Sequence, residues 1–190
     1  MGGNTLLNRF KSDESLLRKF STGSHSSFET LYGRYKDAVY HYVLKSVQDS
    51  ACAEDIAHEA WVSVIDKADS FVPDGSLAQP FKQWLYRIAH NKVIDFWRKQ
   101  KNIHYLDEDN DDTLESERRM DGGPEQQYLL VEIERLIAQL PPTQQQSYLL
   151  QLEGFSLAEI ARITNSQPES VKSRLRYGKK KLQQLLEGEA

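Results

Sequence analysis

Apolar residues recur every three or four positions along nearly the whole chain, and no segment alternates between apolar and polar residues. This spacing places the apolar side chains on one face of a helix, whereas a half-buried strand would need a period of two. The sequence therefore predicts an all-α fold made of two small helical bundles. The longest apolar series are Phe28, Leu31, Tyr35, Val39, Tyr42 and Val43; Ile56, Ala60, Val64 and Ile65; and Phe81, Leu85, Ile88, Ala89, Val93 and Phe96.

One break in composition divides the two bundles. Residues 107–117 carry seven acidic side chains and no basic one, and the turn-forming run Asp-Gly-Gly-Pro follows at 121–124. Such a run is typical of a solvated, flexible spacer, although it does not exclude a specific role. We therefore predict a first domain at 1–101, a flexible acidic linker at 102–124 and a second domain at 125–190.

Capping and turn-forming residues predict where the helices begin and end. Ser27 is expected to cap the first long helix, and Ser50 precedes the second. The loop Pro-Asp-Gly-Ser at 73–76 breaks the chain before a third helix, from Phe81 to about Lys99. The remaining helices are expected at 125–140, before the pair Pro141-Pro142, and at 143–153, before Gly154.

Charge and cysteine content exclude several classes of protein. The 190-residue chain has a net charge of −4 and a pI of about 5.8, so bulk positive charge alone cannot bind it to nucleic acid. The single cysteine, Cys52, excludes an intramolecular disulfide and a cysteine-paired zinc site, so we expect no metal and no cofactor. The N-terminus lacks a signal-peptide core, and no apolar run approaches the roughly 18 residues that cross a bilayer. These features predict a cytoplasmic protein without membrane insertion.

Two capping-box patterns lie ten residues apart near the C-terminus. Ser156 and Glu159 form the first, and Ser166 and Glu169 form the second. In a capping box the serine oxygen accepts a hydrogen bond from the third helical amide, and the glutamate reaches back to the amide of the cap. The interval leaves room for one short helix and a tight turn before the next helix begins. This is the spacing of a helix-turn-helix.

The second helix of this motif has one apolar face and one basic face. Val171, Leu175, Gly178 and Leu182 share a face that must pack inward, and the segment 172–181 holds six basic residues and no acidic one. A solvated basic helix end is the simple alternative, because the helix dipole favours cations there. Together with the capping boxes, the pattern favours DNA binding. The expected contacts are Ser173 and Arg176 at base edges and Lys172, Lys179 and Lys180 at phosphates.

The helix that begins near Phe81 carries a second face of mixed chemistry. Trp84, Arg87, Asn91 and Arg98 gather within roughly 60° of one another around its axis. Bases of single-stranded nucleic acid stack on aromatic rings, while guanidinium groups bind the phosphates. The helical angle is equally compatible with Trp84 as a half-buried flank of the core. Both interpretations stay open on the sequence alone.

Segments of both bundles resemble those of bacterial sigma factors. Residues 53–61 (AEDIAHEAW) and 81–97 (FKQWLYRIAHNKVIDFW) resemble sigma region two. Residues 140–142 (LPP), 153–161 (EGFSLAEIA) and 169–175 (ESVKSRL) resemble region four. The segments keep the family's order, and no region three separates them, as in the extracytoplasmic-function group.

The resemblance implies a dissociable subunit that binds core RNA polymerase and directs promoter-specific initiation. In that family, region two binds the β′ clamp helices and opens the minus-10 element, while region four reads the minus-35 element beside the β flap. The implied polymerase-binding residues are Asp55, His58, Glu59, Trp61 and Val62. The implied minus-10 residues are Trp84, Arg87, Asn91 and Arg98, beside the loop 71–80. The implied minus-35 residues are Glu169, Ser170, Lys172, Ser173, Arg174, Arg176 and Lys180.

The resemblance also implies an anti-sigma factor as a regulatory partner and a path for the acidic linker through the RNA-exit channel. It implies no catalytic activity. One alternative function is a free-standing helix-turn-helix regulator, which would bind its operator without polymerase. A second alternative is an enzyme that pairs His58 with Glu59, or His90 with Asp95, for acid–base chemistry. Neither pair comes with a nucleophile, metal-ligand spacing or a phosphate-binding loop, which disfavours this alternative.

Overall fold

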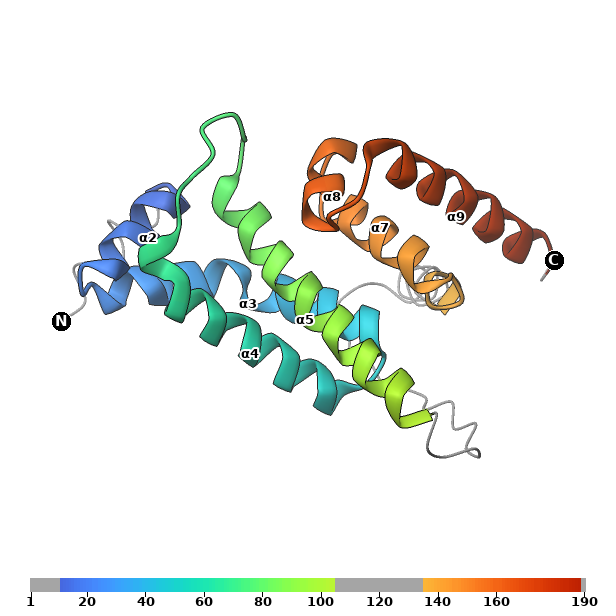
Figure 1. Ribbon diagram of the computed structural model, residues 1–190, viewed down its shortest axis with the longest axis horizontal. Coiled ribbons are helices and arrows are strands. Elements are labelled where there is room, and N and C mark those ends of the chain that lie inside the picture. The colour runs from blue at the N-terminus through green and yellow to red at the C-terminus, as the bar shows by residue number, and fades with distance from the viewer. Residues whose placement is uncertain (1–10, 105–134, 189–190) are drawn as a thin grey trace, which may run out of the picture.

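The computed structural model describes residues 11–104 and 135–188, in which every regular element is a helix (Figure 1). The prediction of an all-α chain in two bundles is confirmed. No helix in these two ranges is long and apolar enough to span a membrane. The first bundle contains α2 (Asp13–Ser21), α3 (His25–Val47), α4 (Ser50–Lys67), the 3-10 helix η1 (Ala68–Ser70) and α5 (Pro80–His104); the second contains α7 (Pro142–Leu152), α8 (Leu157–Ile163) and α9 (Pro168–Gly188).

Two predicted segments fall mainly outside the described residues. These are the acidic linker at 102–124 and the helix expected at 125–140, of which residues 135–138 are helical. α5 continues to His104, beyond its expected end near Lys99. α7 begins at Pro142, one residue earlier than predicted, because the fixed φ of proline suits a first helical turn, where its missing N–H is not needed.

Two serines that were predicted to start helices lie inside them. α3 already includes Ser27, which is buried and whose hydroxyl hydrogen-bonds to Ser24 Oγ at 2.9 Å. α4 includes Ser50, because Asp49 precedes it in an extended conformation and accepts a hydrogen bond from the Cys52 amide at 2.7 Å. This bond lowers the pKa of Asp49. An ionised carboxylate caps the positive end of a helix well, so Asp49 takes the place expected of a serine.

α2 is an element that the apolar pattern did not predict. Ser12 caps it by accepting a hydrogen bond from the Ser15 amide at 3.2 Å. Acidic residues occupy its first turn and basic residues its last, which complements the helix dipole. α2 contributes Leu16 and Leu17 to the core. Its nine residues are too few to show a repeated apolar series, so the capping pattern was its only readable signal.

The predicted apolar series build the core of the first bundle. Leu31 and Val39 of α3 and Leu85 of α5 are completely buried. Ile65, which was predicted on the buried face of α4, is instead 43% exposed. The preceding residue, Val64, takes the buried place, and the next side chain along a helix points about 100° away.

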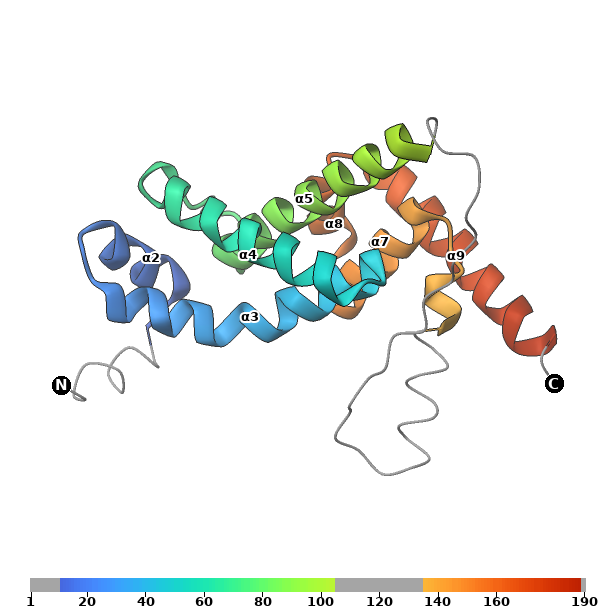
Figure 2. The same cartoon turned by 90° about the horizontal axis from the view of Figure 1, so that it is seen from below.

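The two bundles lie against each other (Figures 1 and 2). α8 packs on α5, and α7 packs on α3. Buried apolar side chains from both bundles form one connected cluster. Where the bundles meet, the ring of Phe155 packs edge-on against the ring of Tyr86, with their centroids 5.0 Å apart. The junction is therefore part of the core.

A buried polar group, which we call the interdomain seam, consists of Tyr42, Ser46, His90 and Gln146. The Gln146 side chain from α7 is 1% exposed. Its Oε1 accepts a hydrogen bond from the Tyr42 hydroxyl and lies 3.2 Å from His90 Nδ1, while its Nε2 donates to Ser46 Oγ at 2.7 Å. Burial raises the pKa of Tyr42, so its hydroxyl stays protonated and can donate. Both polar atoms of the buried amide thus find partners in the first bundle.

The pKa of His90 is lowered in this environment. Burial is the main cause, the hydrogen bond to Gln146 opposes it, and the Arg174 guanidinium of α9 adds to it. Tyr42 of α3 is the other titratable group beside the imidazole. The folded chain therefore keeps His90 neutral to a lower pH than the unfolded chain, which takes up the proton near the ordinary value of about 6.5. The contribution of neutral His90 to the free energy of unfolding is therefore fully present above about pH 6.5. It decreases as the pH falls below that value.

We expect the free energy of unfolding to fall more steeply between about pH 7.5 and about pH 5.5 in the wild-type chain than in a His90→Gln variant. Only the wild-type chain gains a proton at position 90 on unfolding in this range. Urea denaturation followed by circular dichroism at the two pH values measures the difference. Equal pH dependence in the two proteins would contradict a buried neutral imidazole.

Candidate nucleic-acid interface

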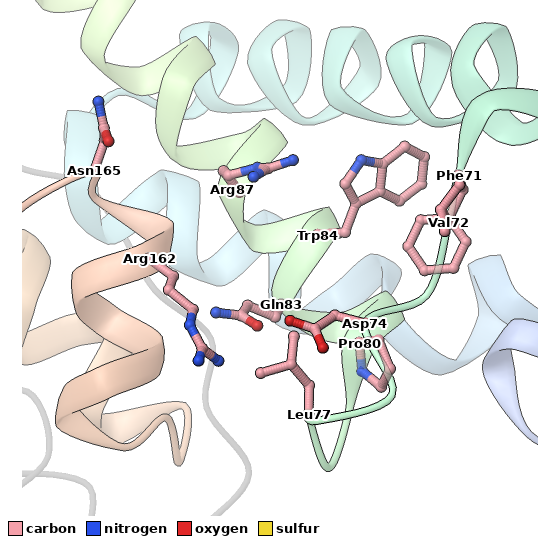
Figure 3. Close-up of a pocket in the computed structure, with 10 residues that line it drawn as sticks. All are labelled: Phe71, Val72, Asp74, Leu77, Pro80, Gln83, Trp84, Arg87, Arg162 and Asn165. Carbon is pink, nitrogen blue, oxygen red and sulfur yellow. The ribbon is translucent and has the colours of Figure 1, made fainter.

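A cavity of about 350 Å³ lies between the loop 71–79, α5 and α8 with its following turn (Figure 3). The loop contains no helical residue, as its turn-forming residues predicted. The cavity combines the loop and helix that were expected at the minus-10 element with two side chains of the second bundle. Its lining residues are Phe71, Val72, Asp74, Leu77, Pro80, Gln83, Trp84, Arg87, Arg162 and Asn165.

Trp84 forms the aromatic wall of this cavity. Its ring centroid lies 4.9 Å from that of Phe71 and 6.1 Å from that of Phe81. The indole is half-buried and packs against the core, yet it also lines the cavity. Trp84 therefore fits both interpretations that the sequence left open. An aromatic side chain in this position offers a stacking surface for an unpaired base.

The polar groups of the cavity come from both bundles. Arg87 reaches it from α5 and Arg162 from α8 (Figure 3). Gln83 is 5% exposed, and its Nε2 donates to a backbone carbonyl of α8 at 3.4 Å, while its Oε1 has no partner among the described residues. The Asp74 carboxylate accepts hydrogen bonds from the Ser76 hydroxyl at 2.7 Å and amide at 2.9 Å, which lower the pKa of Asp74. The cavity thus offers both cationic donors and acceptors to a polar ligand.

The other two predicted minus-10 residues lie outside the cavity. Asn91 and Arg98 are exposed further along α5. Arg98 donates to Asp95 at 3.3 Å, and at 1.5 Å of rise per residue it lies about 21 Å from Trp84 along the helix axis. The structure therefore brings Trp84 and Arg87 together and leaves Asn91 and Arg98 as separate polar positions on the same helix.

The predicted polymerase-binding residues form the outer face of α4, with one exception. Asp55, His58, Glu59 and Val62 are exposed. Trp61 is 5% exposed and packs edge-on against aromatic rings of α3. Glu59 accepts a hydrogen bond from Lys92 Nζ at 2.9 Å, which lowers the pKa of Glu59. Trp61 therefore supports this face from beneath.

The helix-turn-helix is built by one capping box and one left-handed residue. Ser156 Oγ accepts from the Glu159 amide at 3.4 Å, and Glu159 Oε2 accepts from the Ser156 amide at 2.8 Å, so the first predicted capping box is confirmed. α8 then ends, and Asn165 turns the chain with φ 47°. Asparagine tolerates this conformation better than most residues because its short polar side chain bonds locally.

The second predicted capping box is wrong. α9 begins at Pro168, so Ser166 lies two residues before the helix. Its hydroxyl donates to the Thr164 carbonyl at 3.2 Å and accepts from Arg174 Nη1 at 2.9 Å. Glu169 instead pairs with Lys172 at 3.7 Å. Proline at the first position starts the helix here, and Ser166 serves the turn.

α9 presents the two faces that the sequence predicted. Val171 is completely buried, and Gly178 is buried beside the Tyr148 ring of α7, which an added Cβ would meet at 3.4 Å, an ordinary van der Waals distance. Arg176 lies over the ring of Tyr177 at 5.0 Å and is exposed. Glu169, Ser170, Lys172, Lys179 and Lys180 are exposed as well, Ser173 is half-buried, and Arg174 points to the turn through Ser166.

Comparisons with known sequences identify both bundles. Residues 31–103 match the family described as Sigma-70 region 2, and residues 130–182 match Sigma-70, region 4. The ECF RNA polymerase sigma factor SigW of Bacillus subtilis (strain 168) is 31% identical over 180 residues, which cover 90% of this chain and 94% of SigW. The RNA polymerase sigma factor CarQ of Myxococcus xanthus is 27% identical over 172 residues, which cover 90% of this chain and 95% of CarQ.

Two solved structures share the fold. CnrH, in complex with the cytosolic domain of CnrY, superposes with a TM-score of 0.69 at 21% identity and covers 95% of this chain and 100% of CnrH. The sigma factor RpoE of Bartonella quintana, in complex with the anti-sigma factor NepR, superposes with a TM-score of 0.70 at 21% identity and covers 84% of this chain and 96% of RpoE.

The left-handed turn residue allows a specific test of the helix-turn-helix. We expect Asn165→Val to lower the free energy of unfolding by about 1–2 kcal/mol, because a β-branched residue is strained at positive φ. Asn165→Gly should change the free energy of unfolding by only about a few tenths of a kcal/mol, because glycine adopts positive φ without strain. Urea denaturation of the full chain measures both. Gln167→Val, two residues further along at negative φ, is the control, and an equal cost of the two valine substitutions would contradict the turn.

Proposed function

This chain belongs to the extracytoplasmic-function sigma factors of RNA polymerase, and we propose that three of its surfaces divide the work of bringing core polymerase to a promoter. As a sigma factor it directs transcription initiation. The residues that perform each task are our assignment. Their support comes from exposure, charge and the position of each side chain in the two bundles.

The outer face of α4 is our candidate for binding the β′ clamp helices. Asp55, His58, Glu59 and Val62 form it, and the buried Trp61 fixes its position. A face that mixes two carboxylates, an imidazole and an exposed apolar side chain suits a protein partner with basic and apolar groups. The contact with Lys92 lowers the pKa of Glu59, so the Glu59 carboxylate is ionised near neutral pH and forms an ion pair within this face.

The cavity beside Trp84 is our candidate for the unpaired strand of the minus-10 element. Trp84 and Phe71 supply stacking surface, and Arg87 supplies a phosphate ligand. Opening a duplex costs about 1.4 kcal/mol per stacked step on average, so contacts of this kind must offset that cost together with polymerase. Asn91 and Arg98 would follow the strand further along α5.

The basic face of α9 is our candidate for the minus-35 major groove, and it is the observation that carries the proposed function. The capping box at Ser156 and the left-handed Asn165 hold α9 across α8 as a second helix of a helix-turn-helix. We assign Arg176 and Ser173 to base edges and Lys172 and Lys180 to phosphates. Glu169 and Ser170 lie at the start of the same helix, and Arg174 would act by holding the turn.

Regulation, location and the absence of catalysis complete the proposal. CnrH and RpoE are each complexed with another protein, which for RpoE is an anti-sigma factor, and we propose an anti-sigma factor for this chain as well. Sigma factors are non-catalytic initiation factors that act with core polymerase, so we place this chain in the cytoplasm without chemistry of its own. A separate role as a polymerase-independent regulator has no supporting observation beyond the helix-turn-helix.

Transcription from a genomic fragment library, with purified core polymerase and with or without this chain, tests the proposed function. We expect a defined set of start sites to appear only when the chain is present. Fragments around those sites should share two sequence elements. An unchanged set of transcripts would contradict the function.

Arg176→Ala should reduce initiation at promoters from that set by about 5- to 150-fold, which corresponds to a lost base contact worth 1–3 kcal/mol. In assays where promoters with an intact and a mutated minus-35 element compete, the variant should no longer prefer the intact element. Gln183→Ala, an exposed substitution further along α9, is the matched control. The same loss at templates that lack the upstream element would mean that Arg176 does not read it.

Glu59→Ala should raise the Kd for core polymerase about fivefold, as expected for loss of one exposed charged contact worth about 1 kcal/mol. Its far-ultraviolet circular dichroism should not change, because Glu59 is exposed and its ion pair with the half-buried Lys92 lies near the surface. Fluorescence anisotropy with labelled chain gives the Kd. Asp69→Ala, an exposed acidic position in η1 beyond the end of α4, is the control, and a Kd equal to that of the control would contradict the assignment.

A further inference from the structure

α2 lies outside the residues that match Sigma-70 region 2, yet it contacts three other elements of the first bundle. The match begins at residue 31, whereas α2 ends at Ser21. α2 packs on α3, η1 and α5 (Figure 1). It also lines a second cavity, of about 320 Å³, together with Phe71 of the loop 71–79. Because Phe71 lines the cavity beside Trp84 as well, α2 borders the candidate minus-10 site.

The two acidic residues in the first turn of α2 have different partners. Asp13 accepts hydrogen bonds from the Tyr35 hydroxyl and the Arg34 guanidinium, both on α3. Glu14 is half-buried, and its Oε1 accepts a hydrogen bond from the Phe81 amide of α5 at 3.3 Å. Asp13 thus anchors α2 on α3, while Glu14 connects α2 to a residue 67 positions further along the chain.

The hydrogen bond to Glu14 involves the first backbone donor of α5. The helix begins with Pro80, which has no N–H, so the Phe81 amide is the first donor, and amides of a first turn have no acceptor within their helix. The residue before the helix is Gln79, which is not among the residue types that cap well. Glu14 therefore caps α5 from a distant part of the sequence. A carboxylate also suits the positive end of the helix dipole.

Phe81 joins this cap to the candidate minus-10 site. Its side chain is completely buried. The centroid of its ring lies 5.7 Å from that of Tyr35, 6.3 Å from that of Phe71 and 6.1 Å from that of Trp84. A displacement of Phe81 would therefore disturb both aromatic rings that line the cavity. Arg87 follows on the same helix and would move with it.

Both ends of the loop 71–79 are held by α2. The loop follows η1, which packs on α2, and it leads into α5, whose first donor is bonded to Glu14. Within the loop, Asp74 accepts hydrogen bonds from Ser76 and, through its carbonyl, from the Leu77 amide. These local bonds shape a turn but do not fix its place relative to Trp84. That place therefore depends on the anchors at the two ends of the loop.

We propose that Glu14 is a positioning residue for the minus-10 site: it caps α5 from α2 and thereby holds Trp84 and the loop 71–79 in the arrangement that receives the unpaired strand. The proposal deepens the proposed function and rests on it, because it takes the cavity beside Trp84 as the place of that strand. Glu14 acts through the start of α5 and does not contact nucleic acid in this role. Its loss should slow promoter opening without weakening the binding of core polymerase.

Hydrogen–deuterium exchange of the free chain tests the cap directly. We expect Glu14→Ala to speed exchange at the start of α5, within residues 81–86, by about two- to thirtyfold, the range of a lost helix cap. Glu14→Gln keeps an acceptor oxygen at the same length and should restore most of the protection. Glu14→Asp keeps the charge but is one carbon shorter, so it should behave like Glu14→Ala. Glu29→Ala, at an exposed acidic position on α3, is the matched control.

The rate of promoter opening tests the positioning role. Core polymerase carrying each variant is mixed with a promoter from the library experiment, and the permanganate reactivity of unpaired thymines in the minus-10 element gives the rate. At saturating holoenzyme, Glu14→Ala and Glu14→Asp should slow opening by about two- to thirtyfold, whereas Glu14→Gln and Glu29→Ala should stay within about twofold of the wild type. The Kd for core polymerase should be the same for every chain.

Unchanged exchange in Glu14→Ala would overturn the cap. Opening that is equally slow in Glu14→Gln and Glu14→Ala would also overturn it, because the charge and not the hydrogen bond would then matter. Faster exchange with an unchanged opening rate would mean that Glu14 only stabilises the fold, which overturns the positioning role.

If Glu14→Ala does not fold, the milder Glu14→Asp takes its place in both measurements. If the wild-type holoenzyme opens no promoter, the proposed function fails and the positioning role fails with it. Exchange in the free chain would still decide whether Glu14 caps α5, so the two failures can be told apart.

Discussion

One connected apolar core passes through both bundles, and the orientation of every described helix follows from the part of the core that it covers. None of these helices could bury its apolar face alone. α8 has seven residues and is too short to be stable without neighbours, so its position depends on α5, α7 and α9. The helix-turn-helix is thus held in place partly by the first bundle. This dependence couples the two halves of the chain more closely than a tethered pair of independent domains.

The surfaces assigned to function consist of helix faces that do not contribute to this core. α4 turns its charged side away from the other helices, α5 turns Trp84 and Arg87 into a cavity, and α9 turns its basic side to solvent. The net charge of −4 does not conflict with DNA binding, because basic residues gather locally, as in the segment 172–181 of α9, which holds six basic residues and no acidic one. Weak affinity of the isolated chain for DNA is compatible with a subunit that works only within a larger assembly.

The sequence predicted those features that depend on neighbours within a few residues. The helical class, the Ser156 capping box and the inward face around Val171 and Gly178 all follow from such short-range patterns. The errors at Ser27, Ser50 and Ser166 have one cause, since several residues near a helix end can cap it and sequence alone does not rank them.

Burial of polar and aromatic side chains was harder to predict. Gln146 occurs in a run of three glutamines, a composition typical of a solvated face. It is nevertheless buried against Tyr42 and Ser46, which lie about a hundred positions earlier in the chain, so no local pattern could predict its burial. Trp61 is similar, since its burial depends on aromatic rings of α3. The family resemblance indicated which residues to consider, but only the fold separates those that face outward from those that support them.

The ring of Phe155 shows what the contact between the two bundles covers. It is 6% exposed because Tyr86 and Lys82 of the first bundle cover it. Separation of the bundles uncovers aromatic surface on both sides, of the order of 150–250 Å² for each ring. A chain in that state is a better substrate for proteases and chaperones than the compact one. The contact between the two bundles therefore protects the chain by keeping this aromatic surface covered.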